Sequence, residues 1–486
     1  MHDLRAKEED LSYIQFLGAA GVVTGSKHLI NTGNEGGKSG IQVLIDCGLF
    51  QGQKEWRERN WQDLPIPARE VEAVILTHAH LDHSGWIPRL VKQGFHGPIY
   101  ATPATIDLCG ILLPDSGRLQ EEDAAFNNRY KTSKHDPALP LYTMQEAQQC
   151  LTLFQPLNFE ESKRLSDELS FRFVPAAHIL GSSMVEVSLT SGGSASRLLF
   201  TGDIGRVRES EVSPGRVLRS GPTENERCDV LVMESTYGNR EHPQDDPKPE
   251  LAALIRTTIQ RGGSVVIPAF AVERTQKLLF LLKALMESGD TPRIPVHTDS
   301  PMAIKAVQIF LKYANEFGPE TESLIKQYGS PLDWPNFYFD LTPDDSKKIN
   351  ESKYPAIIVS SSGMATGGRV LHHLMQRLPD PHNLVLFIGF QAPGTRGYDI
   401  KNGASQIKIF GQLVAVRAQV ASLEQFSDHA DTPELLEWLH TFQAAPKQTF
   451  LVHGEPAAAT ALRDVMSGNL HWNVQVAAYR QKVPIA

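Results

Sequence analysis

The chain has 486 residues, of which 41% are hydrophobic and 21% are charged, and its formal net charge is −9. This is an ordinary globular composition, and the length suggests about two or three domains. The acidic balance argues against a protein that holds nucleic acid over one broad basic face, so an anionic partner would have to meet a local basic groove or a metal ion.

The cysteines, the first residues and the apolar runs indicate the cellular environment of the protein. The four cysteines are scattered and form no C-x-x-C pair, which argues against a cysteine-type zinc site and a disulfide framework and indicates a reducing, cytoplasmic environment. The first eleven residues lack the apolar core of a signal peptide, and no apolar run reaches about 18 residues. We therefore expect no membrane partner.

Short apolar, β-branched runs recur along the chain and end abruptly in polar or small residues. A helical pattern follows four of them, which are residues 71–76, 264–270, 356–363 and 448–452. Such strand–loop–helix units predict a layered α/β protein with buried sheets. Functional groups in these folds gather on loops after the carboxyl ends of the strands.

Other segments are typical of strands without a following helix. Residues 11–26 and 171–189 have strand–turn–strand patterns, and 196–203 and 229–236 are strands that end in carboxylates. Residues 31–40 (NTGNEGGKSG) predict a hairpin loop. The polar stretch 241–250 (EHPQDDPKPE) predicts a connector at a domain boundary.

The stretch 77–85 (THAHLDHSG) concentrates metal ligands. His78, His80, Asp82 and His83 directly follow a buried strand. Zinc favours histidine nitrogen and aspartate oxygen, at about 2.0–2.2 Å. A single strand-end histidine is usually a hydrogen-bonded structural residue, but this density of titratable groups has no simple structural explanation. Further candidates at strand ends are Asp46, His178, Asp203 and His453.

The pattern HAHLDH resembles the signature of the metallo-β-lactamase superfamily. The order Asp46, HAHLDH, His178, Asp203 is similar too. The resemblance implies an α/β fold, an αββα metallo-β-lactamase sandwich with a dinuclear site at one edge. Members hydrolyse lactams, thioesters or phosphodiesters, so these motifs alone do not name the substrate.

Further motifs resemble those of the β-CASP nucleases. They are MESTYG at Glu234, FSDHAD at His429 and LVHGE at His453, with residues 268–276, 298–303 and 360–368. The resemblance implies an inserted α/β β-CASP domain at 239–405, between a first metallo-β-lactamase part at 1–238 and a C-terminal return at 406–486. It is greatest to prokaryotic relatives of the cleavage and polyadenylation nuclease, and weaker to ribonuclease J. The KH-bearing extension of archaeal relatives and the C-terminal domain of ribonuclease J are expected to be lacking.

The resemblance also implies roles for individual residues. One Zn²⁺ would be held by His78, His80 and His178, and a second by Asp82, His83 and His453, with Asp203 between them. Two such ions clamp the scissile phosphate in two-metal enzymes, so Asp82 and Asp203 count as catalytic as well.

Three acid–base or supporting roles complete the expected site. His429 would be the general acid, because its unperturbed pKa lies near working pH. Glu234 would orient it and favour its charged form. Asp46 would fix the tautomer of a ligand histidine. The alternative for Glu234 and Asp46 is the capping of strand ends.

The inserted domain is expected to hold the substrate. Small residues in SSSGMATGG would let backbone N–H groups approach a phosphate at the start of a helix. Arg274 could donate two hydrogen bonds to a phosphate. An ordinary turn and an ordinary helix-surface arginine are the alternatives. The residues concerned are Arg274, Ser360, Ser361, Ser362, Gly363 and Gly367.

The sequence therefore favours a zinc-dependent ribonuclease that cuts single-stranded RNA, as an endonuclease and/or a 5′→3′ exonuclease, leaving 5′-phosphate and 3′-hydroxyl ends. A histidine at position 453 is typical of RNA-processing members, whereas the DNA-repair branch carries an apolar residue there. The alternatives are a DNA nuclease, a non-catalytic RNA-binding subunit and a small-molecule hydrolase. A homodimer is left open.

Overall fold

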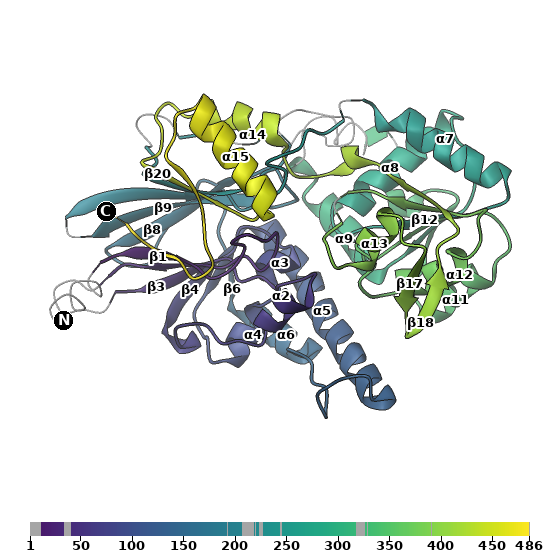
Figure 1. The fold of residues 1–486 in the computed structure, drawn as a ribbon, viewed down its shortest axis with the longest axis horizontal. Coiled ribbons are helices and arrows are strands. Elements are labelled where there is room, and N and C mark those ends of the chain that lie inside the picture. The colour runs from purple at the N-terminus through teal and green to yellow at the C-terminus, as the bar shows by residue number, and fades with distance from the viewer. Residues whose placement is uncertain are drawn as a thin grey trace.

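The computed structural model describes residues 11–485 except 34–39, 192, 207–217, 219, 223–226, 244, 317–325, 328 and 390. The chain folds into two lobes that lie side by side (Figure 1). The first lobe contains both the beginning and the end of the chain, and the second is formed by the middle. Among the described residues, no helix combines the length and the apolar character needed to cross a bilayer.

Two seven-stranded sheets form the centre of the first lobe. One has the order β22-β1-β2-β3-β4-β5-β6, and the other has the order β21-β20-β11-β10-β9-β8-β7. The strands of the first are β1 (Tyr13–Phe16), β2 (His28–Asn31), β3 (Gln42–Ile45), β4 (Val71–Ile75), β5 (Ile99–Ala101), β6 (Phe154–Pro156) and β22 (Lys482–Pro484). Those of the second are β7 (Ser162–Arg164), β8 (Leu169–Pro175), β9 (Ser183–Ser191), β10 (Ser194–Phe200), β11 (Val230–Glu234), β20 (Gln448–Val452) and β21 (Val474–Val476).

The two sheets face each other across one apolar core, to which Phe16, Val43, Phe173, Phe200 and Phe450 contribute. Helices cover both outer faces (Figure 1). On the first sheet lie α2 (Lys54–Arg59), α3 (Leu81–Ser84), α4 (Ile87–Lys92), α5 (Pro103–Tyr130) and α6 (Met144–Cys150), and on the second lie α14 (Thr432–Leu439) and α15 (Pro456–Asn469). Strands buried on both faces are mainly apolar, as residues 230–233 of β11 and 450–452 of β20 are. The predicted αββα sandwich is confirmed.

The second lobe is built on a six-stranded, wholly parallel sheet of order β14-β13-β15-β12-β16-β19. Its strands are β12 (Val265–Pro268), β13 (Val296–Asp299), β14 (Phe337–Phe339), β15 (Ile357–Ser360), β16 (Leu384–Phe387) and β19 (Gln419–Ser422). Its helices are α7 (Pro247–Gln260), α8 (Arg274–Glu287), α9 (Pro301–Lys312), α11 (Pro343–Glu351), α12 (Val370–Arg377) and α13 (Arg396–Lys401). A separate hairpin consists of β17 (Gln406–Ile409) and β18 (Gln412–Ala415).

Two boundaries differ from the expectation. The second lobe extends beyond residue 405, because β17 and β18 pack on α12 and β19 pairs with β16 in its sheet. The connector expected at 241–250 gives way to α7 at Pro247, because the Asp246 side chain accepts from the backbone N–H of Lys248 and caps the helix. Most of the hairpin loop predicted at 31–40 lies outside the described residues, and the flanking β2 and β3 pair in antiparallel fashion.

Candidate metal centre

The predicted metal ligands lie at the carboxyl ends of strands on one edge of the first lobe. His78 and His80 follow β4, and α3 then carries Asp82 and His83. His178 follows β8, Asp203 follows β10 and His453 follows β20. One strand of the first sheet and three of the second deliver these groups to a common edge, as expected for layered α/β proteins.

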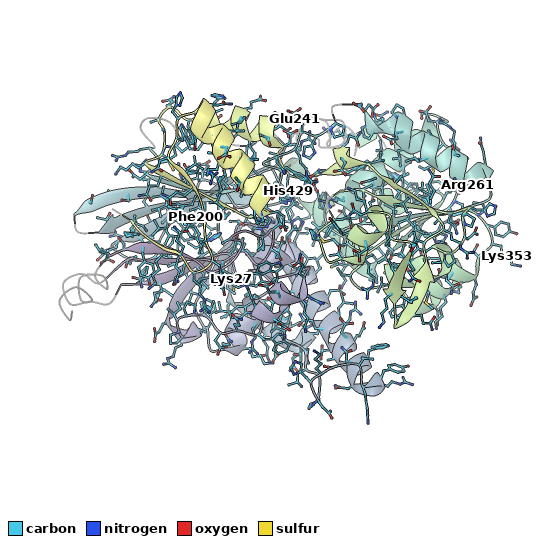
Figure 2. The ribbon with its side chains drawn as sticks, in the orientation of Figure 1. Lys27, Phe200, Glu241, Arg261, Lys353 and His429 are labelled. Carbon is cyan, nitrogen blue, oxygen red and sulfur yellow. The ribbon has the colours of Figure 1, made fainter. Side chains whose placement is uncertain are left out.

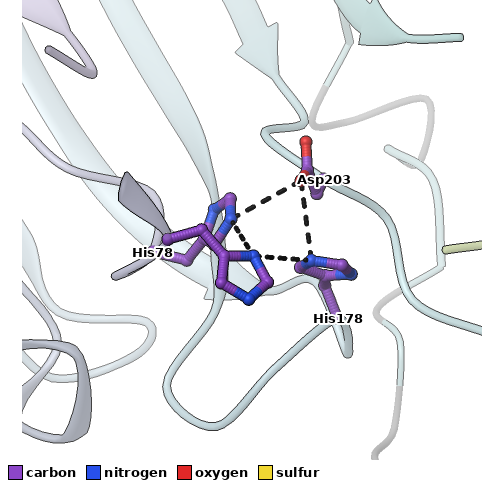
Figure 3. Close-up of side chains that lie close together, drawn as sticks. His78, His178 and Asp203 are labelled. Carbon is purple, nitrogen blue, oxygen red and sulfur yellow. Dashed lines mark hydrogen bonds and ion pairs between the residues drawn. The ribbon is translucent and has the colours of Figure 1, made fainter. Parts of the chain in front are cut away.

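The first group comprises His78, His80, His178 and Asp203. Nε2 of His78 lies 3.2 Å from Nδ1 of His80, which lies 3.3 Å from Nε2 of His178. Both Nε2 atoms lie 3.5 Å from Oδ2 of Asp203. Figure 3 shows these side chains turned toward one another. The group therefore presents nitrogen and oxygen atoms to one small space.

The second group comprises Asp82, His83 and His453. Nε2 of His83 and Nε2 of His453 lie 3.2 Å apart, and the latter is 3.4 Å from Oδ2 of Asp82. Oδ1 of Asp203 lies 3.2 Å from Nε2 of His83. Asp203 thus stands between the groups, with one oxygen directed at each.

The donor set fits bound cations. Oδ1 of Asp203 is buried and makes no hydrogen bond to any described residue, which is costly for a carboxylate oxygen. Burial lowers the pKa of His78, His80 and His178, so these imidazoles are neutral and their lone pairs are available. Neutral imidazole nitrogens and carboxylate oxygens are the ligands that zinc binds in proteins, and Oδ1 of Asp203 is free to be one of them.

His83 has a different electrostatic environment. Burial acts to lower the pKa of His83, but the carboxylates of Asp203 and Asp46 outweigh it and hold that pKa well above its ordinary value. Nδ1 of His83 lies 2.7 Å from Oδ2 of Asp46, which also accepts from the Thr77 hydroxyl. With its Nδ1 proton held by Asp46, His83 directs Nε2 at the centre, where a bound cation would replace the second proton.

His429 lies beside the first group and contacts Glu234. Its Nδ1 is 3.2 Å from both carboxylate oxygens of Glu234, and its Nε2 is 3.9 Å from Oδ2 of Asp203. Burial acts to lower the pKa of His429, but Glu234 and then Asp203 raise it to about 9. An imidazolium with its Nε2 proton facing the centre can act as a general acid.

Three family models match the chain in order: the metallo-beta-lactamase superfamily over residues 37–234, the Beta-Casp domain over 275–400 and the Zn-dependent metallo-hydrolase RNA specificity domain over 413–477. The chain is 35% identical to Ribonuclease TTHA0252 of Thermus thermophilus, over 96% of this chain and 99% of that protein. The chain belongs to the β-CASP family of the metallo-β-lactamase superfamily.

Two further relatives extend the comparison. Transcription termination factor FttA of Methanosarcina mazei is 31% identical, over 87% of this chain and 64% of that protein. An RNase J-like protein of Methanocaldococcus jannaschii is 30% identical, over 85% of this chain and 87% of that protein. The family predicted from the sequence is confirmed.

A groove of about 3460 Å³ lies between the metallo-β-lactamase lobe and the β-CASP lobe. His80, Asp82, Asp203, His429 and His453 line it on the first side, and loops after β12, β13 and β15 line it on the other. Figure 2 places His429 where the two lobes meet. A substrate in this groove would touch the candidate centre and the β-CASP loops together.

Arg274 lies in the groove wall but is not an ordinary helix-surface arginine. It is buried at the start of α8, where its Nε lies 3.4 Å from Oδ2 of Asp428 and its guanidinium stacks on Phe270 at 4.8 Å. Lys277 contacts the other oxygen of Asp428 at 2.6 Å. A phosphate-binding role for Arg274 stays a prediction, and such a phosphate would share the guanidinium with Asp428.

The serine- and glycine-rich β-CASP loop lies partly in the groove. Ser361, Ser362, Gly363 and Gly367 line it, and a side chain at Gly363 would collide with the Phe270 ring. Ser360 does not fit the predicted contact with substrate, because it is buried in β15 and donates to the carbonyl of Asp299 at 3.0 Å.

The helix after this loop does not begin directly at the glycines. α12 starts at Val370, because Gly368 adopts a positive φ of 79° and breaks the helical conformation. The hydroxyl of Ser362 accepts from the N–H groups of Thr366 and Gly367, so these amides are occupied within the loop.

Sequence reasoning missed residues that support the predicted ones. His242 is buried, and its Nε2 donates to the carbonyl of His429 at 2.9 Å. The Thr236 hydroxyl lies 3.2 Å from Nδ1 of His453. The carbonyl of Asp428 accepts from Nδ1 of His178 at 3.1 Å. Thr236 and Asp428 lie inside the quoted motifs MESTYG and FSDHAD, which was the available signal.

Proposed function

We propose that this chain is a zinc-dependent ribonuclease that hydrolyses phosphodiester bonds of single-stranded RNA and leaves 5′-phosphate and 3′-hydroxyl ends. The observation that carries the proposal is Asp203 between two groups of ligand atoms, beside the His429–Glu234 pair, on the floor of the groove between the lobes. The 35% identity to a protein named a ribonuclease, over nearly the whole of both chains, supports RNA as the substrate.

Two zinc ions are the proposed cofactors. His78, His80 and His178 would hold one, and Asp82, His83 and His453 the other, with Asp203 in contact with both. When bound, the zinc ions would neutralise charge on the scissile phosphate and make a water molecule more acidic.

The surrounding residues contact the Nδ1 atoms of three ligand histidines and so fix the orientation of their rings. Asp46 accepts the Nδ1 proton of His83 and so keeps Nε2 directed at the centre. The carbonyl of Asp428 does the same for His178. The Thr236 hydroxyl lies against Nδ1 of His453 and donates to the carbonyl of that residue. Such contacts orient ligand rings and raise ligand basicity.

His429 would supply the proton for the leaving group. As water attacks phosphorus, the bond to the ribose 3′ oxygen breaks, and Nε2 of His429 donates a proton to that oxygen. Glu234 favours the charged imidazole beforehand and orients the ring. Oε1 of Glu234 also accepts from the backbone N–H of Ile204 at 2.5 Å, so the carboxylate is itself fixed.

The groove between the lobes favours a single strand over a duplex, because the candidate centre lies between the two lobes at its floor. The endonuclease and 5′→3′ exonuclease modes share this chemistry, and both stay within the proposal. The homodimer and the cytoplasmic location stay predictions from the sequence.

The test measures the metal content of the purified protein and its cleavage of 3′-end-labelled RNA with a 5′-phosphate or a 5′-hydroxyl, of internally labelled closed-circular RNA, and of matched DNA. We expect about two zinc per chain and cleavage of RNA in preference to DNA. His78→Ala should abolish cleavage while the circular dichroism spectrum is kept, and the exposed His382→Ala is the matched control. Equal cleavage by metal-free His78→Ala would overturn the proposal, and preferential cleavage of DNA would favour the DNA nuclease.

A further inference from the structure

Helix α5 connects the candidate centre to a distant, exposed surface. Its N-terminal end lies beside the loop of His178, where the Thr102 and Thr105 hydroxyls donate to the carbonyl of Gly181 at 2.7 and 2.9 Å. The helix has 28 residues, which corresponds to a length of about 42 Å. Figure 1 shows its distal part leaving the first lobe and projecting past the gap between the lobes.

The distal end of α5 carries two exposed aromatic rings in contact with each other. Phe126 and Tyr130 lie one turn apart, with ring centroids 4.6 Å apart, and their side chains are 40% and 56% exposed. Leu139, in the segment that returns from the helix, is 65% exposed. Single exposed apolar residues need no explanation, but a contacting aromatic pair with a third exposed apolar residue on a projecting arm points to a binding surface.

The tip of this end, between Asp123 and Asp136, is locally basic within an acidic chain. Residues 127–135 (NNRYKTSKH) contain Arg129, Lys131 and Lys134 and no acidic residue, whereas the whole chain carries −9. All three cations are exposed, and none forms an ion pair with another described residue. The Arg129 guanidinium lies 5.5 Å from the centre of the Tyr130 ring. Aromatic rings interleaved with unpaired cations match the chemistry of single-stranded nucleic acid, which offers bases to the rings and phosphates to the cations.

This surface is continuous with the groove. Phe126, Tyr130 and Lys134 line the same hollow as His80, Asp203 and His429. The opposite wall is formed by the β17–β18 hairpin, where Phe410 is 39% exposed and its ring centroid lies 4.6 Å from that of His372, with Lys408 nearby in sequence. A strand that leaves the candidate centre along the groove would therefore meet aromatic rings and cations on both walls.

We propose that the end of α5 is a second binding site for single-stranded RNA, which stacks bases on Phe126 and Tyr130 and holds phosphates with Arg129 and Lys134. The proposal rests on the proposed ribonuclease function. From Thr105 to Tyr130 the helix rises by about 38 Å, which corresponds to on the order of ten nucleotides at ~3.4 Å each. Because every base has a π-face, the site distinguishes RNAs by length and not by sequence.

The test compares two RNAs that share one cleavage site, one of about 6 and one of about 20 nucleotides, since only the longer reaches the arm. We expect the double variant Phe126→Ala/Tyr130→Ala to raise KM for the longer RNA about tenfold, with kcat unchanged and no effect on the shorter RNA. Tyr130→Phe should retain wild-type behaviour. Tyr354→Ala, at an 81% exposed tyrosine outside the groove lining, is the matched control.

The cations are tested separately by salt dependence. Arg129→Ala/Lys134→Ala should lower the slope of log affinity against log salt for the longer RNA by about 1.4, the value for two phosphate contacts with a single strand. An unchanged slope would contradict their role.

Three results would overturn the proposal: no change with either RNA, an equal loss with both, or a change of molecular mass in light scattering, which would make the arm an interface between copies of the chain. If the wild type cleaves neither RNA, the ribonuclease function fails instead. Fluorescence anisotropy of the longer RNA on the same variants, without added metal, then still decides whether the arm binds.

Discussion

Two buried clusters of aspartate and histidine lie at the carboxyl ends of strands, one in each lobe, and they differ in how their carboxylates are satisfied. In the β-CASP lobe, Asp299 at the end of β13 accepts from Nε2 of His373 at 2.8 Å, from the Ser346 hydroxyl at 2.6 Å and from Arg369 at 2.6 Å. In the metallo-β-lactamase lobe, Oδ1 of Asp203 makes no hydrogen bond to a described residue. Similar residues thus form a self-sufficient network in one lobe and an incomplete one in the other.

The difference teaches how to separate a structural cluster from a functional one. A buried carboxylate with all its acceptors occupied contributes to folding without any ligand, whereas a buried carboxylate that keeps one oxygen without a hydrogen bond among histidine nitrogens can accept a bound cation. His373 accordingly has a structural role in the β-CASP lobe, while Asp203 stays the residue predicted to be shared between two metal ions.

The largest expected effect is on catalysis. Asp203→Asn should lower kcat/KM for RNA by at least about 10³-fold, because a metal interaction worth several kcal/mol is lost. The unfolding free energy of the metal-free protein should fall, because Oδ1 of Asp203 lies 3.2 Å from Nε2 of His83 and, against the effect of burial, histidines hold the pKa of Asp203 well below its ordinary value, but it should fall by less than in Asp299→Ala. RNA cleavage rates and denaturant unfolding in chelator measure the two quantities. A metal-free variant much less stable than the wild type would remove the contrast with Asp299.

Asp299→Ala should affect stability and leave metal binding unchanged. Removing this carboxylate leaves Arg369 and His373 without their buried partner, so we expect a loss of about 3–5 kcal/mol in the unfolding free energy. Zinc content per folded chain should be unchanged. Denaturant unfolding and metal analysis of the purified variant test this, and a variant as stable as the wild type but without zinc would show that the two clusters are coupled.

Removal of the metal should lower the stability of the metallo-β-lactamase lobe more than that of the β-CASP lobe. Binding to the folded state alone stabilises by about 3 kcal/mol at 100 times the dissociation constant, so chelation should lower the melting temperature of the metallo-β-lactamase lobe. The Asp299 cluster needs no metal, and the unfolding of the β-CASP lobe should move less. Hydrogen exchange with and without chelator, followed in β4 and in β13, measures the difference.

Asp46 should have a smaller effect than Asp203. Asp46→Asn keeps the shape but weakens the hold on Nδ1 of His83, and such supporting contacts typically change metal affinity or activity by about 10–100-fold. Zinc titration of the apoprotein measures the change. An unchanged affinity would assign Asp46 to the capping of β3, the alternative left open by the sequence.

The smallest effect concerns acid stability of the β-CASP lobe. Burial lowers the pKa of His373 below its ordinary 6.5. Burial acts to raise the pKa of Asp299, but hydrogen bonds from His373, Ser346 and Arg369 lower it below 3.8. Both groups bind protons more weakly in the folded state than in the unfolded state. Their contribution to the unfolding free energy is therefore complete above the ordinary pKa values of 6.5 and 3.8, and it is lost as pH falls toward the lower pKa values of the folded state.

Denaturant unfolding of the wild type and His373→Gln between pH 7 and pH 4 measures this dependence. The variant should lose the part of the decline that begins below pH 6.5. Identical profiles for the two proteins would exclude His373 as its source.

Much of the fold and of the candidate site could be predicted because local sequence carries it. An apolar run that ends in His78 or Asp203 is a strand whose carboxyl end bears a ligand, whatever its neighbours are. The β-CASP boundary at 405 could not be placed in this way, because β19 belongs to the second lobe only through its pairing with β16. Ser360 likewise resembles its groove-lining neighbours in sequence, and only β15 pairing buries it.

The sequence by itself determined the chemistry of the centre, because the residue types, their spacing and their place after buried strands restrict which groups can bind a metal. Tertiary structure alone decided their partners. Arg274 meets Asp428 across 154 positions of the chain, and His242 reaches the carbonyl of His429 across 187. It also brought Phe126 and Tyr130 to the groove of His429. Periodicity shows which face of an element is buried, but the packing of distant elements selects what that face meets.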